Sequence, residues 1–351
     1  MVSSSQDIAA TLLDWYDDHA RSLPWRAPPG SPSPDAYRVW LSEVMLQQTT
    51  TAAVAPYFAQ FTRRWPTVEA LADADEADVM AAWAGLGYYA RARNLVACAR
   101  KVASRGGEFP RTEADLRELP GLGAYTAAAV AAIAFDQRAV VVDANVERVV
   151  ARLFAIADPL PAGRKALRTA ADTITPDARA GDFAQAMMDL GARVCTSKAP
   201  RCPLCPLAEP CKAQAQGNAE RFPVKPPKKA RPTRSGTAYW VQRGDAVWLV
   251  RRPGKGMLGG MRALPDDGWS ASSDGSGKPP LPGPWERAGA VNHVFTHFAL
   301  ELRLAVYSGD KWANLDHNRG EWWPLAEMED AGLPTLFAKA ARLAFAQTGD
   351  D

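Results

Sequence analysis

The sequence predicts a two-domain protein, with an all-helical N-terminal domain followed by a C-terminal domain of the α+β class. At 351 residues the chain is longer than one ordinary hydrophobic core organises, and its 47% hydrophobic and 23% charged residues are typical of globular proteins. Over residues 1–215 apolar side chains recur every three or four positions, with Pro or Gly at the breaks, which indicates helices. Beyond residue 235, alternating and β-branched apolar runs predict strands.

The domain boundary is predicted in a basic, proline-rich linker at residues 221–234. This stretch contains FPVKPPKKARPT, in which prolines and like charges favour an extended chain. It separates a helical domain, residues 1–220, from the C-terminal domain, residues 235–351. In the latter, the runs TAYWVQ, AVWLVRR, HVFTHFALELRLAVY and EWWPL predict a mainly antiparallel sheet. Residues 332–347 predict a final helix, and the low-complexity residues 267–284 predict a mobile loop.

Four of the five cysteines fall in one run with the spacing C-x6-C-x2-C-x5-C. They are Cys195, Cys202, Cys205 and Cys211. Four thiolates in one loop form a complete ligand set for a soft metal, and an iron–sulfur cluster is favoured over zinc because structural zinc usually uses two C-x2-C knuckles. Disulfides are the weakest alternative, since the N-terminal residues lack the basic and apolar regions of a signal peptide. Cys98, in an Ala-rich segment, is predicted to be a small core residue.

The net charge of +2 is unevenly distributed along the chain. Residues 193–234 hold ten Lys or Arg against two Glu, which makes this segment +8 and leaves −6 for the remainder. Such a basic collar around the cysteines predicts a polyanion partner, nucleic acid first, although a solvated linker explains the charge equally well. The longest apolar stretch, residues 127–135, is far shorter than the roughly 20 residues that span a bilayer, so a soluble, cytoplasmic protein is expected.

A glycine-rich turn opens the most apolar helix of the sequence. In LPGLGAYTAAAVAAIAF, residues 119–135, Gly121 and Gly123 follow a proline and precede an Ala-rich helix. Their bare amides can approach a phosphate, so residues 112–134 resemble a helix-hairpin-helix, a clamp for the DNA backbone. The same turn also occurs as a simple helix cap.

Further along, Asp143 ends an apolar run and precedes a new helix, with Asn145 two residues on. An aspartate in this place is often only an N-cap. However, a helix-hairpin-helix, then such an aspartate, then this cysteine run resembles the endonuclease III superfamily of DNA glycosylases. Within it, the chain resembles the adenine DNA glycosylase (MutY) family through LPWR (23–26), VWLSEVMLQQT (39–49), GLGYYARARNL (85–95) and FAQAMMDLGARVCT (183–196).

The resemblance implies a monofunctional hydrolase that removes adenine mispaired with 8-oxoguanine or guanine and carries a [4Fe-4S] cluster on the four cysteines. Glycosylase-lyases of the superfamily attack the sugar with a Lys just before the Thr of the hairpin motif, where this chain has Tyr125. The resemblance instead makes Tyr125 a hydrogen-bond donor near the catalytic carboxylates.

Glu43 and Asp143 are the predicted catalytic pair, and Asn145 stands beside the second of them. Cleavage needs an acid that protonates the purine and a carboxylate that stabilises the sugar cation. Glu43 shares a helix face with Leu46, so desolvation is expected to raise its pKa and keep it protonated. The hypothesis is that Glu43 protonates adenine N7 and that Asp143 stabilises or briefly bonds C1′. The alternative for Glu43 is a surface carboxylate on an amphipathic helix.

Other residues are implied to hold the extruded base. Gln48 and Tyr88 are expected to enter the duplex beside it, the alternatives being an exposed helical amide and a core aromatic. The adenine pocket is expected to be lined by Trp25, Arg26, Leu46 and Gln185. An insert at residues 27–34, APPGSPSP, lengthens the loop that follows Arg26.

Residues 235–351 resemble the Nudix-like C-terminal domain of the same family. The glutamate cluster of Nudix hydrolases is missing from the sequence, so pyrophosphate hydrolysis is not expected. In HVFTHF, residues 293–298, Thr296 and His297 resemble a Phe-Ser-His turn that contacts 8-oxoguanine, although a turn satisfying its own backbone is an equal alternative. In residues 251–265, Arg262, Ala263 and Leu264 replace the family's Trp, Glu and Phe; these three positions depart from the pattern.

Two other functions stay open at this point: an endonuclease III-like glycosylase-lyase and a non-catalytic iron–sulfur DNA-binding protein. Tyr125 argues against the first, and the pair of Glu43 and Asp143 argues against the second. The expected partner is double-stranded DNA containing A:8-oxoguanine or A:G mispairs, bound by a monomer in the nucleoid, with no membrane association.

Overall fold

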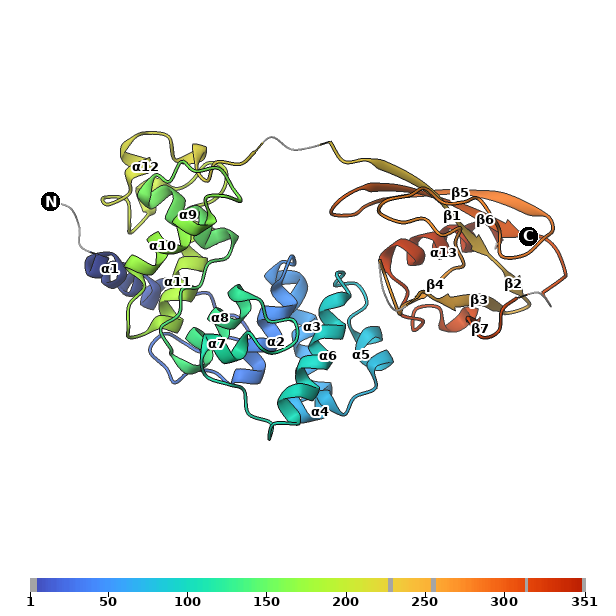
Figure 1. Ribbon diagram of the computed structural model, residues 1–351, viewed down its shortest axis with the longest axis horizontal. Coiled ribbons are helices and arrows are strands. Elements are labelled where there is room, and N and C mark those ends of the chain that lie inside the picture. Colours follow the sequence, from blue (N-terminus) through green and yellow to red (C-terminus); the bar gives the residue numbers. More distant parts are fainter. Residues whose placement is uncertain (1–4, 227–229, 254–256, 313–314, 349–351) are drawn as a thin grey trace. The chain divides into compact units, whose positions relative to one another are not determined.

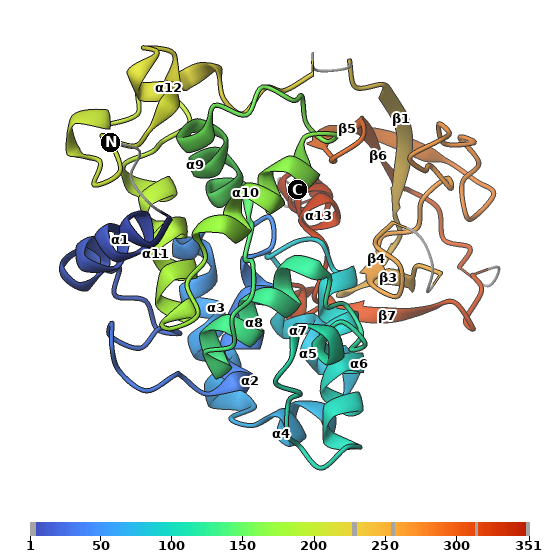
Figure 2. The same ribbon diagram turned by 60° about the vertical axis from the view of Figure 1, so that its left-hand side comes forward.

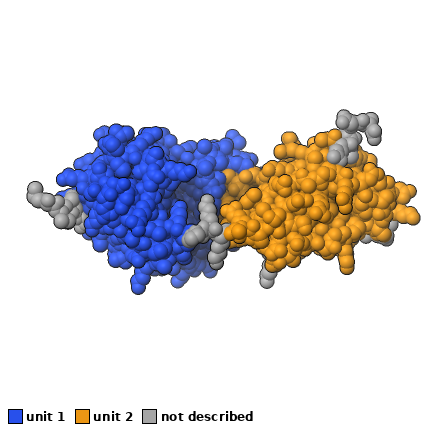
Figure 3. Space-filling view, turned by 90° about the horizontal axis from the view of Figure 1, so that it is seen from above, with its two compact units in different colours: residues 1–74, 93–227 blue, residues 75–92, 228–351 orange. Residues whose placement is uncertain are grey.

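The computed structural model describes residues 5–226, 230–253, 257–312 and 315–348. The chain divides into two compact units, drawn in different colours in Figure 3. The first comprises residues 1–74 and 93–227, and the second comprises residues 75–92 and 228–351. Within the described ranges, no helix combines the length and the apolar character needed to cross a membrane. Part of the predicted linker and part of the 251–265 segment lie outside the described residues.

Helices account for the regular structure of the chain up to its linker, as the apolar periodicity predicts. They are α1 (Ser5–His19), α2 (Ala36–Leu46), α3 (Thr51–Arg64), α4 (Val68–Ala72), α5 (Glu76–Ala82), α6 (Ala90–Ala103), α7 (Glu113–Leu116), α8 (Ala124–Phe135), α9 (Ala144–Phe154), α10 (Arg164–Ile174), α11 (Ala180–Arg193) and α12 (Lys212–Ala215), with short 3-10 turns at Cys202–Leu204 and Ala219–Arg221. Cys98 is fully buried on α6, which confirms its prediction as a core residue.

Helix α8 is the centre of the helical core, and it contacts α2, α7 and α11 (Figure 2). It buries every residue from Thr126 to Ala134. Its small side chains let neighbouring helices approach closely: a Cβ on Gly181 of α11 would lie 2.6 Å from the Ala132 carbonyl oxygen. Helix α11 packs against α9 in the same way, because a Cβ on Gly191 would lie 2.6 Å from Asn145 Cβ. These close contacts bring α2, α8, α9 and α11 around one site.

The C-terminal domain contains two sheets and one long helix. One sheet has the order β1-β6-β5 and the other is built on β3, which pairs with β2, β4 and β7. The strands are β1 (Thr233–Trp240), β2 (Gln242–Arg243), β3 (Ala246–Arg251), β4 (Arg262–Ala263), β5 (Trp285–Val294), β6 (Ala299–Tyr307) and β7 (Gly320–Pro324). After a 3-10 turn at Leu325–Glu327, helix α13 (Thr335–Thr348) packs against β1, β5 and β6 (Figure 1).

The α+β prediction is confirmed, with three differences in detail. Strands β1 and β6 pair in parallel, whereas the other named strand pairs are antiparallel. The apolar run 293–307 is interrupted by a turn at residues 295–298, so its two parts belong to β5 and β6. The segment 267–284, predicted to be mobile, is anchored because Trp269 and Leu281 are each only 1% exposed. Large apolar side chains are buried in the core even when the residues around them are polar and predict an exposed segment.

Candidate active site

Glu43 lies on α2 and is only 5% exposed, so its carboxyl is a buried group. The Tyr125 hydroxyl donates a hydrogen bond of 2.7 Å to Glu43 Oε2. Burial raises the pKa of Glu43 to about 7, while the Tyr125 hydrogen bond and the charge of Arg26 oppose the rise and the charge of Asp143 adds to it. The predicted burial and raised pKa are therefore confirmed, and the alternative of a surface carboxylate is wrong.

Asp143 is the N-cap of α9, and both of its carboxylate oxygens have a partner. Oδ1 accepts a hydrogen bond of 2.7 Å from the backbone N–H of Val146, and Oδ2 accepts one of 2.9 Å from Asn145 Nδ2. The N-cap interpretation is thus correct for the first oxygen. It does not exclude a catalytic role, because the second oxygen is held by a neutral amide near the Tyr125–Glu43 pair.

Tyr125 interacts electrostatically with both Glu43 and Asp143. Burial first, then the negative charges of Glu43 and Asp143, raise the pKa of Tyr125 well above its ordinary value. The phenol therefore stays protonated and remains a donor. Its oxygen also lies 3.6 Å from Met188 Sδ on α11, so three helices fix its position. We call Glu43, Tyr125, Asp143 and Asn145 the carboxylate site.

Two of the predicted adenine-pocket residues, Trp25 and Arg26, lie in the loop between α1 and α2. Trp25 is 5% exposed and meets the Phe58 ring edge-on, with 5.3 Å between centroids. Arg26 Nη1 contacts both oxygens of Asp189 at 2.8 and 2.9 Å. The insert after Arg26 is tied down where the Gly30 N–H donates to Asp182 Oδ2 at 3.1 Å. The insert therefore does not prevent Arg26 from reaching Asp189.

The other two predicted pocket residues lie on the helices that frame the carboxylate site. Leu46 is half-buried at the last position of α2, and Gln185 is 5% exposed on α11. Asp189, one turn further along α11, is fully buried, and sequence reasoning missed it. The signal was available, since an acid stands inside the apolar run AQAMMDLGA and a buried acid needs a partner.

The two predicted duplex-entering residues share an unusual backbone conformation. Gln48 has a φ of 60° and Tyr88 a φ of 50°, in the left-handed region that non-glycine residues rarely adopt. Gln48 lies beyond the end of α2, so it is not a helical amide, and Tyr88 is 49% exposed, so it is not a core aromatic. The guanidinium of Arg91 lies 5.5 Å from the Tyr88 ring centroid. Strained, exposed side chains of this kind cluster at functional sites.

The turn before α8 contains two glycines whose backbone positions differ in what they allow. Gly121 has a φ of 78°, and a Cβ there would lie 2.6 Å from Asn94 Cβ, so a side chain is excluded twice. Gly123 is the N-cap of α8 and supplies no side-chain cap. Nothing lies within 4 Å of a Cβ at Gly123, so the space beside this glycine is open. The positive end of α8 thus points toward whatever binds here.

The four cysteines of the run line one hollow, together with Arg152 of α9. Among the described residues, no three His, Cys, Asp or Glu side chains converge enough to bind a single metal ion. Four cysteine thiolates are the ligand set that iron–sulfur clusters use. The donor set is therefore compatible with an iron–sulfur cluster.

Two arginines of α9 bind the cysteine loop, and sequence reasoning missed both. Arg148 Nε donates to the Cys195 carbonyl oxygen at 2.7 Å, and its Nη2 donates to Asn145 Oδ1 at 2.9 Å. Arg152, only 2% exposed, donates to Cys195 Sγ at 3.2 Å. It also donates to the carbonyl oxygens of Thr196, Ser197, Ala219 and Phe222. The i, i+4 spacing in ERVVAR was the available signal, because it places both guanidiniums on one helix face.

Known proteins are similar in sequence to most of this chain. An adenine DNA glycosylase of Rattus norvegicus is 36% identical over 98% of this chain and 79% of its own length. The chain belongs to the adenine DNA glycosylase family. The Homo sapiens member is 35% identical over 95% of this chain and 73% of its own, and the Mycolicibacterium smegmatis member is 44% identical over 59% and 69%. Residues 41–174 match the HhH-GPD superfamily of base excision DNA repair proteins, and residues 237–343 match the NUDIX domain family.

Solved structures of related enzymes resemble the helical part of this glycosylase. A thermostable thymine-DNA glycosylase is 28% identical, with a TM-score of 0.54 over 60% of this chain and 97% of its own. A non-covalent endonuclease III–DNA complex is 23% identical, with a TM-score of 0.51 over 61% of this chain and 98% of that one, and supports the fold alone. The family is one of DNA-binding enzymes, so DNA is the partner of this chain.

The C-terminal domain of the enzyme presents Thr296 and His297 on an exposed turn. The backbone N–H of Phe295 donates to the Phe298 carbonyl oxygen at 2.8 Å, so the turn closes without the Thr296 hydroxyl. The Thr296 Oγ1 lies instead 3.5 Å from the Tyr88 hydroxyl, within the second compact unit. We call residues 295–298 the reading turn.

The three residues that differ from the family pattern, Arg262, Ala263 and Leu264, all pack within the C-terminal domain. The Arg262 guanidinium lies 4.1 Å from the Trp323 ring centroid and pairs with Glu321 at 2.8 Å. Ala263 and Leu264 are fully buried. The altered segment is therefore structural in this domain.

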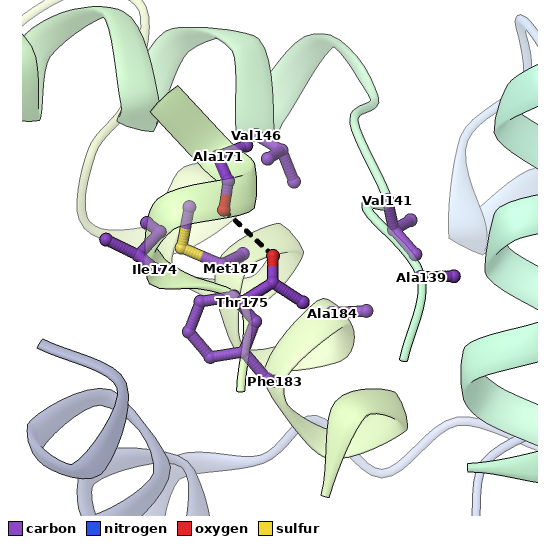
Figure 4. A pocket seen from close by; sticks show the side chains of 9 residues that line it. All are labelled: Ala139, Val141, Val146, Ala171, Ile174, Thr175, Phe183, Ala184 and Met187. Atoms are coloured by element: carbon purple, nitrogen blue, oxygen red, sulfur yellow. Dashed lines mark hydrogen bonds between the residues drawn. The ribbon is translucent and has the colours of Figure 1, made fainter. Parts of the chain in front are cut away.

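The apolar hollow drawn in Figure 4 is separate from the carboxylate site. It is lined by side chains such as Val146, Phe183 and Met187 and holds no titratable group among its lining residues. Its polar contact is internal, since the Thr175 hydroxyl donates to the Ala171 carbonyl oxygen at 2.8 Å. This hollow lacks the groups that glycosidic cleavage needs.

Proposed function

We propose that this enzyme removes adenine mispaired with 8-oxoguanine or guanine and leaves an abasic site without cutting the strand. The proposal divides the chain into a glycosylase domain (1–220), a linker (221–234) and a lesion-reading domain (235–351), acting as a monomer. The observation that carries it is the carboxylate site, in which a buried Glu43 with a pKa of about 7 accepts a hydrogen bond from Tyr125 near Asp143. That arrangement suits an acid that must be protonated at neutral pH.

In the proposed mechanism Glu43 donates its proton to N7 of the flipped adenine. The C1′–N9 bond then breaks, and its electron pair leaves with the base as neutral adenine. Asp143 stabilises the positive charge that develops on the sugar. Water attacks C1′ and loses a proton to Asp143. Proton exchange with solvent then restores the Asp143 carboxylate and the Glu43 acid, so the balance is one water consumed and one adenine released. Tyr125 orients Glu43, and Asn145 holds the second oxygen of Asp143.

The absence of an amine in the carboxylate site supports hydrolysis over lyase chemistry. A glycosylase-lyase needs a nucleophilic amine that forms a Schiff base with the sugar. At the place of that amine the chain has Tyr125, whose phenol is engaged with Glu43 at 2.7 Å.

Several exposed groups support the proposed hold on DNA. The amides at Gly121 and Gly123 would bind phosphate, and the strained Gln48 and Tyr88 would enter the base stack beside the extruded adenine. Trp25, Arg26, Leu46 and Gln185 would surround the extruded base. Thr296 and His297, with their polar atoms on an exposed turn, would contact 8-oxoguanine in the opposite strand.

Cys195, Cys202, Cys205 and Cys211 would hold the [4Fe-4S] cluster, which when bound cross-links the loop through iron–sulfur bonds. Three basic residues lie in or next to this loop: Arg193, Lys198 and Arg201. All three are exposed to solvent. The proposed role of this loop is to present those charges to the phosphate backbone.

Single-turnover excision from synthetic duplexes tests the proposal. The enzyme should release adenine from A:8-oxoguanine and A:G duplexes and leave A:T duplexes uncut. Borohydride should trap little covalent protein–DNA product, because no Schiff base forms. Efficient trapping would favour the lyase, and duplex binding without excision would favour a non-catalytic protein.

A further inference from the structure

Asp189 is a fully buried carboxylate that faces two arginines. Its Oδ1 accepts from Arg21 Nε at 2.6 Å and from Arg26 Nη1 at 2.8 Å. Its Oδ2 accepts from the backbone N–H of Arg21 at 2.9 Å and from Arg26 Nη1 at 2.9 Å. The Arg26 side chain is only 7% exposed, whereas that of Arg21 is 24% exposed.

Arg26 is shared between this ion-pair cluster and the carboxylate site. Glu43 on α2 experiences Tyr125 from α8, Arg26 from the loop after α1, and Asp143 from the start of α9. On the other side, Asp189 of α11 shares its surroundings with Tyr16 of α1 and Asp182 of its own helix.

Tyr16 and Asp182 differ in what they contribute to this cluster. Burial raises the pKa of Tyr16 to about 12, so Tyr16 is neutral near pH 7. Asp182 is engaged with Arg179, which lies 2.9 Å away. Asp189 is therefore the carboxylate in direct contact with Arg26.

A buried cation close to a catalytic acid opposes its function. Positive charge favours the ionised carboxylate, and the effect is strong where water is excluded. Arg26 has this effect on Glu43, although Glu43 must keep its proton to donate it. A second carboxylate bound directly to Arg26 offsets the charge and fixes the guanidinium in place.

We propose that Asp189 is a positioning residue that holds Arg26 and offsets its positive charge, so that Glu43 keeps its proton at neutral pH. The inference rests on the proposed function, because it assigns Glu43 the role of acid. A purely structural ion pair would join α11 to the loop after α1 without influence on the protonation of Glu43.

Two substitutions of opposite sign separate these roles. Asp189→Asn makes the cluster more positive, whereas Arg21→Gln makes it less positive, and Arg21 is the more exposed partner. The measurement is the pH dependence of single-turnover adenine excision from an A:8-oxoguanine duplex. Asp189→Asn should move the alkaline limb down by about half a pH unit or more. Excision at pH 8, expressed as a fraction of each enzyme's own acidic plateau, should then be about threefold lower in the variant than in the unmodified enzyme. Arg21→Gln should move the limb up.

The control is Asp172→Asn, which removes the carboxylate bound by Arg138 at 2.7 Å on α10. Its pH profile should match that of the unmodified enzyme. Unchanged limbs in both test variants, or limbs that move in the same direction, would overturn the proposal.

Folding and function are tested separately in the same experiment. Thermal unfolding of each variant shows whether it folds. If Asp189→Asn does not fold, Arg21→Gln decides alone, since an upward shift supports the proposal and an unmoved limb rejects it. An unmodified enzyme that excises no adenine at any pH would instead reject the proposed function.

Discussion

The carboxylate site and the reading turn place their polar groups in opposite environments. In the carboxylate site, Glu43 is 5% exposed and Asp143 has protein partners on both oxygens. In the reading turn, Thr296 and His297 are exposed, and the Thr296 hydroxyl has a contact at 3.5 Å, at the limit of a hydrogen bond. Under the proposed function, the groups assigned to the chemistry are held by the protein in advance, whereas the groups assigned to base contact keep their hydrogen-bonding capacity for the DNA.

This difference predicts how strongly each region responds to small changes. Inside the carboxylate site, a conservative substitution such as Glu to Gln removes a buried charge or an exchangeable proton. Neither can be supplied by water in a buried site, so the loss of activity should be large. At the reading turn, water can replace a lost contact. The expected effects therefore fall from the buried acid to the exposed hydroxyl.

The largest effect is expected from the carboxylates themselves. Glu43→Gln removes the acid and Asp143→Asn removes the charge opposite the sugar, so each should lower single-turnover excision by about 10²–10⁴-fold or more. Duplex affinity, measured by filter binding, should change little because neither side chain forms the backbone clamp. Asp14→Asn, an exposed change on α1, is the matched control. Normal excision by either carboxylate variant would remove the acid–carboxylate assignment.

A second large effect is expected at Arg152, which joins α9 to the cysteine loop. Arg152→Met removes a donor to Cys195 Sγ and to four carbonyl oxygens, and each orphaned buried acceptor costs about 1–3 kcal/mol. The variant should retain less iron per chain and lose its visible absorbance faster under chelation. Arg138→Gln, on the surface near α10, should retain iron normally. Equal iron in both variants would show that the thiolates alone hold the loop.

The carboxylate site was more predictable from sequence than its supporting residues. Helical periodicity placed Glu43 beside apolar neighbours, but its burial and raised pKa were predicted only with the motif that resembles the glycosylase family, because a surface carboxylate was otherwise favoured. Helical periodicity did not identify the partners of Asp189 or Arg152, because buried polar pairs join segments that are far apart in the chain. Arg26 and Asp189 are separated by 163 positions.

The C-terminal domain was less predictable because its strand pairing is long-range. Alternating apolar residues indicate a strand, but they do not state whether its neighbour runs parallel, as β1 and β6 do. The composition of residues 267–284, rich in Ser, Gly and Pro, likewise predicted a mobile loop. Burial of the Trp269 side chain in the core anchors this segment despite its composition.

A moderate effect with a defined sign is expected at Tyr125. Its hydroxyl donates to Glu43 Oε2 at 2.7 Å, which stabilises the ionised carboxylate and lowers the pKa of Glu43. Tyr125→Phe removes that bond, so the pKa should rise from about 7 and the alkaline limb of excision should move up by about one pH unit. Below the limb, excision should fall far less than in Glu43→Gln. A limb that moves down would contradict the donor role.

The smallest effect is expected at Thr296, where the reading turn meets solvent. Thr296→Ala removes one exposed hydroxyl, and a single neutral hydrogen bond contributes about 1 kcal/mol, or about fivefold in an equilibrium. Preference for A:8-oxoguanine over A:G, taken as the ratio of excision rates at limiting enzyme, should fall by about that factor. Excision from A:G duplexes should be unchanged, because guanine offers the hydroxyl no oxidised edge. Thr296→Ser keeps the hydroxyl and serves as the matched control, so equal loss in both variants would assign the effect to the methyl group and its packing. Loss on both mispairs alike would mean that the turn holds the DNA without reading the base.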